Sequence, residues 1–302
     1  MKDCLVNRFE MNVRQLWGES GLAWMAALPA LVADLTQHWQ LQHLQPVTNL
    51  SYNYVLTGVR SDDDLAVVLK LGYDVDEIKK EAAALQVYAG RGCVQLLARD
   101  LELGALLLQR VVPGQSLKTF FPGHDVRAME CTIAVMQQLH TALVPSVTTT
   151  FASVADWLQG LHTAHAVRKL SGYHLQKAQS LAQDLLQSAG PAVLLHGDLH
   201  HDNILASAND RWLAIDPKGV WGEAIYEVGA FVRNPVPELL NQKNASQLIA
   251  QRIEFFADQL HADEQRVKAW CYVQAVLADC WAAEQSDDGA LWLAEAAIID
   301  KL

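Results

Sequence analysis

The sequence predicts a two-lobed α+β fold, in which a small β-rich lobe is followed by a larger, mostly α-helical lobe. The length of 302 residues and the hydrophobic content of 51% allow two substantial cores. Short β-prone runs bounded by turn residues gather before residue 112, whereas apolar residues at helical spacing dominate after it. The pair Pro113-Gly114 separates the two patterns. We therefore expect lobes at residues 1–110 and 111–302, joined by a hinge near residues 110–114.

The first lobe is predicted element by element. An amphipathic surface helix that runs into Trp39 is indicated by helical spacing of Leu22, Met25, Ala26, Pro29 and Val32. Two β-prone runs on either side of Gly58 and a polar turn predict a hairpin of strands at 52–57 and 65–69. A helix follows, with Ile78, Ala82, Leu85 and Ala89 on one stripe. Two further strands are expected at 94–98 and 105–112.

In the second lobe, helical spacing runs almost continuously from residue 116 to residue 187. Two short apolar runs, at 193–195 and 212–215, then bracket a polar loop and are predicted as strands. Helix returns after Glu223 and ends in two segments around 270–281 and 290–299. The polar loop between the two strands is therefore where we look first for chemistry.

Charge and cysteine content narrow the class of protein. With 23 basic and 34 acidic side chains the formal charge is −11, so the chain would repel a phosphate backbone, and we expect no nucleic-acid partner. The five cysteines are odd in number, widely spaced and form no C-x-x-C pair, which argues against a disulfide framework and favours a reducing compartment. The apolar stretch 21–35 is interrupted by Pro29 and is shorter than a membrane span requires. The sequence thus predicts a cytoplasmic protein without a membrane partner.

The most informative segment is the polar loop at residues 196–203. His196, Asp198 and Asn203 reproduce the spacing of a protein-kinase catalytic loop, with glycine in place of the arginine. In that chemistry a carboxylate orients the attacking hydroxyl, and an amide oxygen on the same loop binds magnesium. Asp216 ends the following apolar strand, where a second metal-binding carboxylate is expected.

Two other interpretations of this loop stay open from the residues alone. His196, Asp198, His200, His201 and Asp202 offer five candidate zinc ligands within seven residues. No matching distant cluster surrounds His162, His165 or His174, as a zinc hydrolase would normally require. The other interpretation is that His196 and Asp202 brace the loop through hydrogen bonds to the backbone.

Lys70 ends a predicted strand with the sequence AVVLK. This sequence is similar to that of the strand that carries the phosphate-binding lysine of kinases. A buried lysine there needs an anionic partner. Glu81 borders the inward stripe of the following helix and is the favoured partner. Glu77, whose neighbours are more polar, is the alternative.

Together these motifs resemble the aminoglycoside phosphotransferase and kinase-like superfamily, and within it the streptomycin 6-phosphotransferase and hydroxyurea kinase group. The resemblance rests on residues 196–205 (HGDLHHDNIL), 212–219 (WLAIDPKG), 222–223, 226–229 (YEVG) and 233–235 (RNP). Residues 23–29 and 81–85 are also similar, so the resemblance covers nearly the whole chain. It implies a two-lobed protein-kinase-like fold with a nucleotide-binding first lobe and a catalytic and acceptor-binding second lobe.

The resemblance also implies a role for each motif residue. Asp198 would be the catalytic base or hydroxyl-orienting carboxylate, and Asn203 and Asp216 would hold Mg²⁺. Lys70 would clamp the nucleotide phosphates with Glu81 as its ion-pair partner. The adenine would meet backbone groups around Gln109, Arg110 and Val112. The segment expected over the phosphates, 48–53, contains no glycine, so Ser51 and Asn53 would have to supply the donors, and GTP stays an alternative to ATP.

The expected reaction is transfer of the ATP γ-phosphoryl group to a hydroxyl of an aminoglycoside-like or hydroxyurea-like molecule. Residues 221–302 contain 13 acidic and 6 basic side chains, which favours a cationic acceptor in this part of the chain. The candidates for contact with it are Asp279 first, then Trp281, Glu284 and Asp288. The alternatives are a metabolic sugar or amino-alcohol kinase and a catalytically idle ligand-binding protein, and the intact motif residues argue against idleness.

Overall fold

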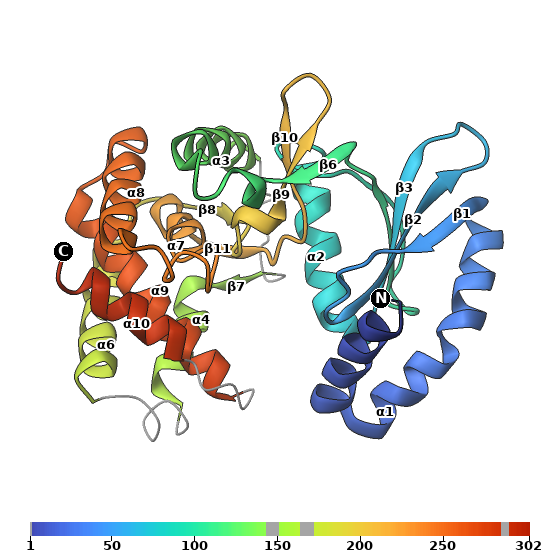
Figure 1. Ribbon diagram of the computed structural model, residues 1–302, viewed down its shortest axis with the longest axis horizontal. Coiled ribbons are helices and arrows are strands. Elements are labelled where there is room, and N and C mark those ends of the chain that lie inside the picture. The colour runs from blue at the N-terminus through green and yellow to red at the C-terminus, as the bar shows by residue number, and fades with distance from the viewer. Residues whose placement is uncertain (1, 143–150, 164–171, 285–289) are drawn as a thin grey trace. The chain divides into compact units, whose positions relative to one another are not determined.

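We describe the protein from a computed structural model, for residues 2–142, 151–163, 172–284 and 290–302. Contacts divide the chain into two compact units. The first comprises residues 1–90 and 94–112, and the second comprises residues 91–93 and 113–302. Figure 1 colours the chain from its N-terminus in blue to its C-terminus in red. The predicted α+β class is confirmed, because the first unit is built on a sheet and the second is mostly helical.

The first unit is a five-stranded antiparallel sheet in the order β1-β2-β3-β5-β4. Its strands are β1 (Leu41–Pro46), β2 (Asn53–Arg60), β3 (Ala66–Gly72), β4 (Leu96–Asp100) and β5 (Ala105–Gln109). The predicted hairpin is confirmed as β2 and β3, and the central β3 and β5 are apolar along most of their length. The edge strand β1 was not predicted, because only one of its six residues is buried and its text, LQHLQP, lacks β-branched residues.

Two helices accompany this sheet: α1 (Lys2–His38) and α2 (Val75–Tyr88). Asp74 caps α2 by accepting hydrogen bonds from the backbone N–H groups of Asp76 and Glu77. Ile78, Ala82 and Leu85 are buried, which confirms the predicted inward stripe for these three residues. The fourth predicted member, Ala89, is exposed, because the helix ends at Tyr88 and Ala89 is its left-handed C-cap.

Helix α1 is longer than predicted, and its stripe has a different phase. Leu28 and Leu35 are buried, whereas Ala26 and Pro29 are exposed, so the predicted stripe is displaced by about one residue. The segment Arg8–His38 is long and apolar enough to span a membrane by length and composition, which the sequence argument did not anticipate. Its buried side chains belong to the core of the first unit, together with residues of β2 and β3, but only 11% of the apolar window is buried.

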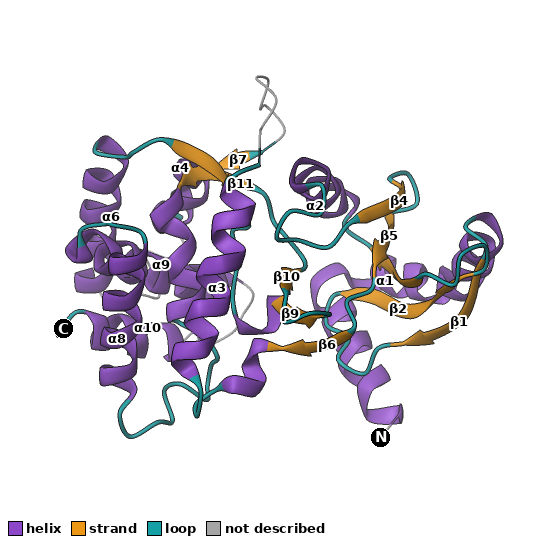
Figure 2. Ribbon diagram, turned by 90° about the horizontal axis from the view of Figure 1, so that it is seen from above, coloured by secondary structure: helices purple, strands orange, loops and turns teal. Residues whose placement is uncertain are grey.

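In the second unit, helices accompany two small three-stranded sheets, β10-β9-β6 and β7-β11-β8 (Figure 2). Its α-helices are α3 (Asp125–His140), α4 (Val154–Leu158), α6 (Gly172–Gln187), α7 (Val228–Val232), α8 (Ala245–Gln259), α9 (Glu264–Glu284) and α10 (Ala290–Ile299). Its strands are β6 (Pro113–Ser116), β7 (Ala152–Ser153), β8 (Ala192–Leu195), β9 (Ile204–Ser207), β10 (Trp212–Ala214) and β11 (Val220–Glu223). Short 3₁₀ turns cover Leu117–Phe120, Gln159–His162, His201–Asn203 and Ala224–Glu227. The two predicted C-terminal helices are confirmed as α9 and α10.

These two small sheets frame the polar loop at 196–203. The loop begins where β8 ends at Leu195 and runs into β9, and β9 pairs with β10 just before Asp216. Strand β11 pairs antiparallel with β8, with Val220 opposite Leu195. Both ends of the loop are thereby fixed by strand pairing, which sequence analysis foresaw for β8 and β10 but not for β9 or β11.

Candidate active site

Lys70 and Glu81 form a buried ion pair inside the first unit. The Lys70 Nζ atom lies 2.7 Å from Glu81 Oε2, and the two side chains are only 5% and 9% exposed. Lys70 reaches this position because it follows Leu69 on the central strand β3, and Glu81 because it lies on the buried stripe of α2. Glu77, the alternative partner, pairs instead with Lys80 at the surface. The predicted pairing with Glu81 is therefore confirmed as geometry.

The other predicted nucleotide residues lie at the start of β2 and at the end of β5. Asn53 is the first residue of β2, opposite Gly72 of β3, and Ser51 lies in the exposed loop before it. The N–H groups of Gln109 and Arg110 donate to the carbonyl oxygens of Gln95 and Ala66. Those two N–H groups are therefore occupied, and a base bound here would have to use carbonyl oxygens or the N–H groups of the next residues, up to Val112.

In the second unit, His196 anchors the beginning of the polar loop. Its Nδ1 accepts a hydrogen bond from the Asp198 N–H at 3.2 Å, so the ring proton sits on Nε2, which donates to the Ile215 carbonyl at 2.7 Å. Burial lowers the pKa of His196, because desolvation outweighs the opposing attraction of Glu227. A neutral His196 thus ties the Asp198 turn to the strand that carries Asp216, as the bracing interpretation proposed.

Glu227 also fixes the turn at residues 196–198, by binding its backbone. Its two carboxylate oxygens accept the backbone N–H groups of His196 at 2.7 Å and Gly197 at 2.9 Å. The side chain is 1% exposed, so these are charge-assisted bonds in a desolvated environment. Sequence analysis quoted Glu227 only as part of the family motif and gave it no role.

Gly197 explains why glycine replaces the kinase arginine in this loop. Its φ angle is 85°, in the left-handed region that glycine adopts readily. A Cβ atom at this position would lie 2.7 Å from the Trp157 ring and 3.1 Å from Val220. Both the backbone and the packing therefore exclude a side chain between His196 and Asp198.

Asp198 presents a partly exposed carboxylate in a positive environment. Its Oδ2 lies 3.6 Å from His200 Nε2, its Oδ1 lies 3.5 Å from Arg233 Nη2, and the side chain is 32% exposed. Burial raises the pKa of Asp198, but the attraction of His200, Arg233 and Lys218 outweighs it and holds the pKa well below the ordinary value. Asp198 is therefore ionised at neutral pH and can accept a hydrogen bond from a hydroxyl group.

Arg233 owes its position to a side-chain amide. Its Nη1 donates to Gln274 Oε1 at 2.9 Å, and its guanidinium lies 5.9 Å from the centre of the Trp292 ring. Gln274 in turn donates to the backbone carbonyl of Tyr226. The Arg233–Gln274 pair links α9 to the catalytic loop, and it was missed because nothing in the sequence pairs residues 41 positions apart.

Asn203 and Asp216 offer the oxygen ligands that Mg²⁺ prefers. The side-chain hydrogen bonds of Asn203 run through Nδ2, to the Asp198 carbonyl at 2.9 Å and to His200 and the Asp198 carboxylate at longer range. Among the described residues this leaves the amide oxygen available to a metal. The Ile215 N–H donates to the Asn203 carbonyl, which sets Asp216 beside it, and Asp216 has a φ of 60°. The donor set fits Mg²⁺ shared with a nucleotide.

The histidines of the loop do not converge as a zinc site would require. His196 bonds to Ile215, His200 Nδ1 accepts from the Asp202 N–H, and His201 stacks on Phe231 with ring centres 4.1 Å apart. Within the described ranges, no three His, Cys, Asp or Glu side chains gather as a metal-binding group. The zinc interpretation therefore has no support in the geometry.

The four residues predicted to contact an acceptor are only partly placed. Asp279, on α9, is 4% exposed, and Trp281 packs edge-on against Trp157 with ring centres 5.6 Å apart. Trp157 also covers Gly197, so the Trp157 ring lies between Trp281 and the turn that carries Asp198. Glu284 is the last residue of α9, and its side chain lies outside the described part, as does Asp288 altogether.

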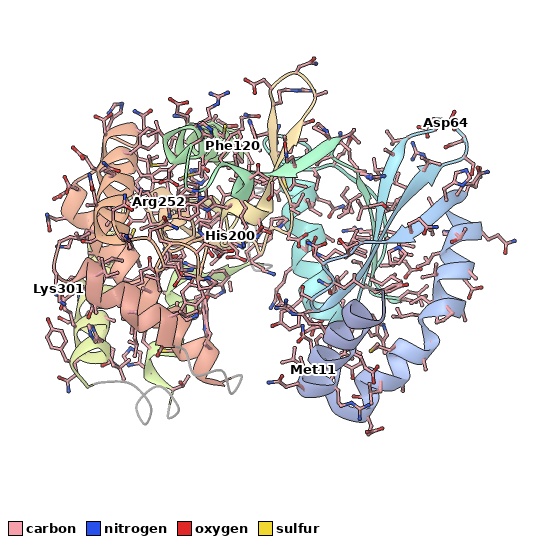
Figure 3. All side chains as sticks on the ribbon, in the orientation of Figure 1. Met11, Asp64, Phe120, His200, Arg252 and Lys301 are labelled. Atoms are coloured by element: carbon pink, nitrogen blue, oxygen red, sulfur yellow. The ribbon has the colours of Figure 1, made fainter. Side chains whose placement is uncertain are left out.

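The second unit also contains a buried ion pair, Arg252 with Asp125, that the sequence did not predict. Arg252 of α8 is fully buried and donates to both oxygens of Asp125 on α3, at 2.6 and 2.8 Å. The guanidinium also donates to the backbone carbonyls of Phe231, Val232 and Asn234. Figure 3 labels Arg252 and the loop residue His200 within the second unit. Arg252 therefore fixes the segment that ends in Arg233.

Glu295 on α10 is a second buried acid that the sequence did not single out. It is 1% exposed, and within the described residues neither carboxylate oxygen has a hydrogen-bond partner. Burial raises its pKa from 4.5 to about 8, against the attraction of Arg233 and Arg252. Glu295 is therefore neutral at pH 7 in the folded protein.

We expect Glu295→Gln to change how stability depends on pH. The folded state binds this proton more tightly than the unfolded state, so the free energy of unfolding of the native protein falls as pH rises from about 4.5 towards 8. Between pH 5.5 and 8 the variant should gain about 3 kcal/mol relative to the native protein. Urea unfolding at both pH values measures this. Glu254→Gln, at an exposed site on α8, serves as the control, and parallel pH profiles for native protein and Glu295→Gln would refute a protonated Glu295.

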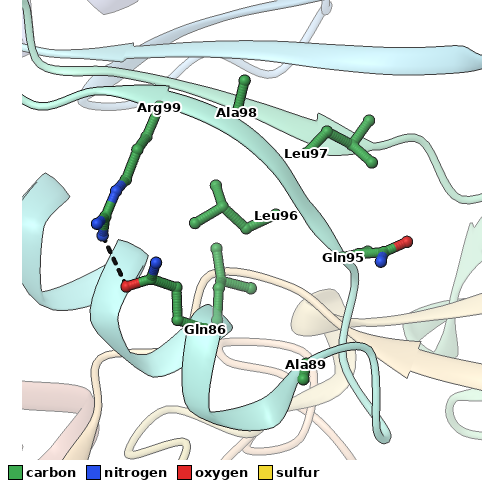
Figure 4. A pocket seen from close by; sticks show the side chains of 8 residues that line it. Gln86, Ala89, Gln95, Leu96, Leu97, Ala98 and Arg99 are labelled. Atoms are coloured by element: carbon green, nitrogen blue, oxygen red, sulfur yellow. Dashed lines mark hydrogen bonds between the residues drawn. The ribbon is translucent and has the colours of Figure 1, made fainter.

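The first unit also contains a pocket of about 430 Å³ at the end of α2 (Figure 4). Leu85, Gln86 and Ala89 line one side, residues 95–99 line the other, and Arg99 bonds to Gln86 at 2.6 Å. None of the predicted nucleotide residues lines this pocket, so we do not assign it to the site.

Comparison with known proteins places these features in context. Residues 38–286 match the family described as aminoglycoside/hydroxyurea antibiotic resistance kinase. The chain is 26% identical over 290 residues to streptomycin 6-kinase of Streptomyces glaucescens, covering 93% of this chain and 92% of that protein. It is 30% identical over 273 residues to hydroxyurea phosphotransferase of Kitasatospora aureofaciens, covering 89% and 77%.

The fold also has solved counterparts. A thermostable mutant of an aminoglycoside phosphotransferase, in ternary complex with ADP and hygromycin B, superposes with a TM-score of 0.67 at 13% identity. The match covers 90% of this chain and 98% of that one. At this identity the likeness concerns the fold, and it confirms the predicted kinase-like arrangement of elements.

Proposed function

This chain belongs to the aminoglycoside/hydroxyurea antibiotic resistance kinase family, and from that premise we propose that it transfers the γ-phosphoryl group of ATP to a hydroxyl of a streptomycin-like or hydroxyurea-like molecule. The observation that carries the proposal is the ionised, partly exposed Asp198 on a turn held by His196 and Glu227. We further propose residues 1–110 as the nucleotide-binding lobe and residues 111–302 as the catalytic and acceptor-binding lobe.

The proposed step is an exchange of one P–O bond for another. The acceptor oxygen forms a bond to the γ-phosphorus, the bond between that phosphorus and the ADP oxygen breaks, and the hydroxyl proton leaves. Asp198 accepts the hydrogen bond of the attacking hydroxyl. Because its pKa is held low, Asp198 is a weak base, so it orients the hydroxyl first and takes the proton only as the new bond forms.

Charge on the phosphates is countered by other residues in this proposal. Lys70 contacts the nucleotide phosphates while Glu81 keeps its ammonium in place. Asn203 and Asp216 would hold Mg²⁺, which when bound would neutralise phosphate charge. The base would meet backbone groups near residues 109–112, with ATP favoured over GTP. Cys131 and Cys271 are buried and form no disulfide, which agrees with the proposed cytoplasmic location.

We place a cationic acceptor group near Asp279, and Asp279→Asn tests this. The variant should raise the KM of a guanidinium-bearing aminoglycoside about tenfold, because one charge-assisted hydrogen bond is lost, while the KM of uncharged hydroxyurea stays the same. The increase should shrink in high salt. Steady-state kinetics with both acceptors at two salt concentrations measure this, and Glu254→Gln is the surface control. An equal effect on both acceptors would mean that Asp279 acts through packing.

The experiment that tests the function is a coupled nucleotide-consumption assay with Mg²⁺ and a panel of acceptors. The panel contains streptomycin, other aminoglycosides, hydroxyurea, and common sugars and amino alcohols. Turnover with the first groups supports the proposal, and turnover with sugars or amino alcohols alone makes the protein a metabolic kinase. Nucleotide binding without turnover of any acceptor would identify an idle binding protein.

A further inference from the structure

The loop between β1 and β2 has an unusual constraint for a phosphate-binding segment. Residues 47–52 contain no glycine, so the backbone cannot rely on glycine to adopt the conformation that brings N–H groups close to a phosphate. The loop is instead held at its ends. The Val47 N–H donates to the Val55 carbonyl at 3.0 Å, and Leu50 packs against the core of the first unit.

A third contact that fixes the loop comes from Asn12, 39 residues before Ser51. Asn12, on the first segment of α1, donates from Nδ2 to the backbone carbonyl of Ser51 at 3.0 Å. Phe9, one turn before Asn12 on the same side of the helix, and Val13, the next residue, are 2% and 0% exposed and belong to the core. Phe9 also contacts Tyr54 of β2, with ring centres 5.9 Å apart. Asn12 is therefore carried by a rigid, packed segment.

The bend in α1 determines where that segment lies. Gly18, with φ 56° and ψ −138°, breaks the helix into two segments, which Figure 1 shows in two shades of blue. At Gly21 a Cβ atom would come within 2.8 Å of Val13 Cγ1, so glycine allows the two segments to touch. Tyr73, which follows β3, donates to Ser20 Oγ at 2.8 Å and packs on Trp17 with ring centres 4.9 Å apart. The bend is thus anchored to the sheet.

The Asn12 bond also sets the direction of the next N–H group. In a planar trans peptide the C=O of one residue and the N–H of the next point in opposite directions. Turning the Ser51 carbonyl towards Asn12 therefore aims the Tyr52 N–H away from α1. Tyr52 is 45% exposed, and no hydrogen bond within the described part of the chain uses its N–H.

We propose that Asn12 is a positioning residue for nucleotide binding, which fixes the glycine-free loop so that the Tyr52 N–H donates to a phosphate oxygen. This rests on the proposed function of the first unit. In the glycine-rich loop of protein kinases, glycine residues lie over the phosphates. In this chain the Asn12 side chain of helix α1 instead fixes the conformation of the loop. Asn12 itself does not touch the nucleotide in this arrangement.

The test uses Asn12→Ala and Asn12→Asp in the full chain, with Arg14→Ala as the matched control. Arg14 lies two residues away on the same segment, is 58% exposed, and pairs only with Glu10 among the described residues. Asn12→Asp keeps the size of the side chain but turns a carboxylate towards the Ser51 carbonyl. Circular dichroism and thermal unfolding establish that all variants fold.

Two readouts separate the loop from the ligand. Hydrogen exchange without nucleotide should show faster exchange of the Val47 amide in both Asn12 variants and no change in Arg14→Ala. Calorimetric titration with ADP should show affinity weakened about five- to tenfold in the Asn12 variants. In kinetics the KM for ATP should rise by a similar factor, while the acceptor KM stays the same.

Each outcome decides the matter. Native-like ADP affinity in Asn12→Asp overturns the inference, whether or not exchange in the loop is faster, and leaves the proposed function intact. A loss of ADP affinity in Arg14→Ala equal to that in Asn12→Asp would also overturn it, since surface charge would then be the cause. If the native protein itself binds no ADP or ATP, the proposed function fails and the inference fails with it.

Discussion

Replacing Asp198 by alanine should lower turnover by about three to four orders of magnitude. The carboxylate is ionised and 32% exposed, and it is the group on the catalytic turn that can accept the acceptor hydroxyl. Nucleotide affinity should stay within about twofold, because Asn203, a proposed Mg²⁺ ligand, bonds at 2.9 Å to the backbone carbonyl of Asp198, which alanine retains, and only at 3.5 Å to its carboxylate. Single-turnover phosphoryl transfer and calorimetric ADP titration measure the two quantities separately.

Asp202→Ala is the matched control for this experiment. Asp202 lies on the same loop with a side chain 52% exposed, and its carboxylate is 3.9 Å from Lys118. Its removal should change turnover by less than about threefold. Turnover of Asp198→Ala within tenfold of the native rate would exclude Asp198 from the mechanism, and an equal loss in Asp202→Ala would point to general disruption of the loop.

Replacing Arg252 by alanine should destabilise the protein by about 3–5 kcal/mol, the usual cost of leaving a buried charge without its partner. The change leaves the Asp125 carboxylate without Arg252 and removes the guanidinium donor from the backbone carbonyls of Phe231, Val232 and Asn234. The melting temperature should fall by about 10 °C. Calorimetry and urea unfolding measure the change.

Two controls separate the ion pair from loss of charge or volume. Arg127→Ala, on the exposed face of α3, should change stability by less than about 1 kcal/mol. Asp125→Leu combined with Arg252→Met should recover part of the lost stability, because it removes both charges and fills the space. If Arg252→Ala melts within 2 °C of the native protein, the pair does not support the second unit.

The sequence predicted the site best where its pattern was local. Lys70 and Glu81 were paired correctly because one follows a β-prone run and the other borders a helical stripe only 11 residues later. Asp198, Asn203 and Asp216 were predicted from fixed spacing within one loop and the next strand, and hydrogen bonds bring these segments together, although their roles stay predictions. In these cases the chain itself determines which residues meet.

The supports of the loop could not be predicted in the same way. Glu227 reaches the backbone of His196 across 31 residues, and Arg252 reaches Asp125 across 127. A carboxylate or guanidinium gives no periodic signal of its tertiary partner. Strands β1 and β9 were missed for a related reason. These segments are short and partly exposed, and pairing with neighbouring strands, not intrinsic β-propensity, keeps their backbone extended.

The acidity of residues 221–302 also has a different meaning in the structure. Glu223 binds Arg266 and Trp270, Glu238 pairs with Lys118, and Asp300 pairs with Lys177. These acids are engaged within the protein, and Glu295 is neutral at pH 7. Total charge therefore overstates the number of carboxylates that could bind a cationic acceptor.

The distance along the chain between Asp198 and its supports has a consequence for synthesis on the ribosome. The catalytic turn emerges before Glu227, and residues 125 and 198 both emerge well before Arg252. Arg252 bonds to the backbone on both sides of Arg233, which lies beside Asp198, so we expect these surroundings of Asp198 to form only after α8 has left the exit tunnel. A nascent chain stalled before residue 252 should thus leave Asp125 without its arginine partner, and the proposed site should be completed only late in translation.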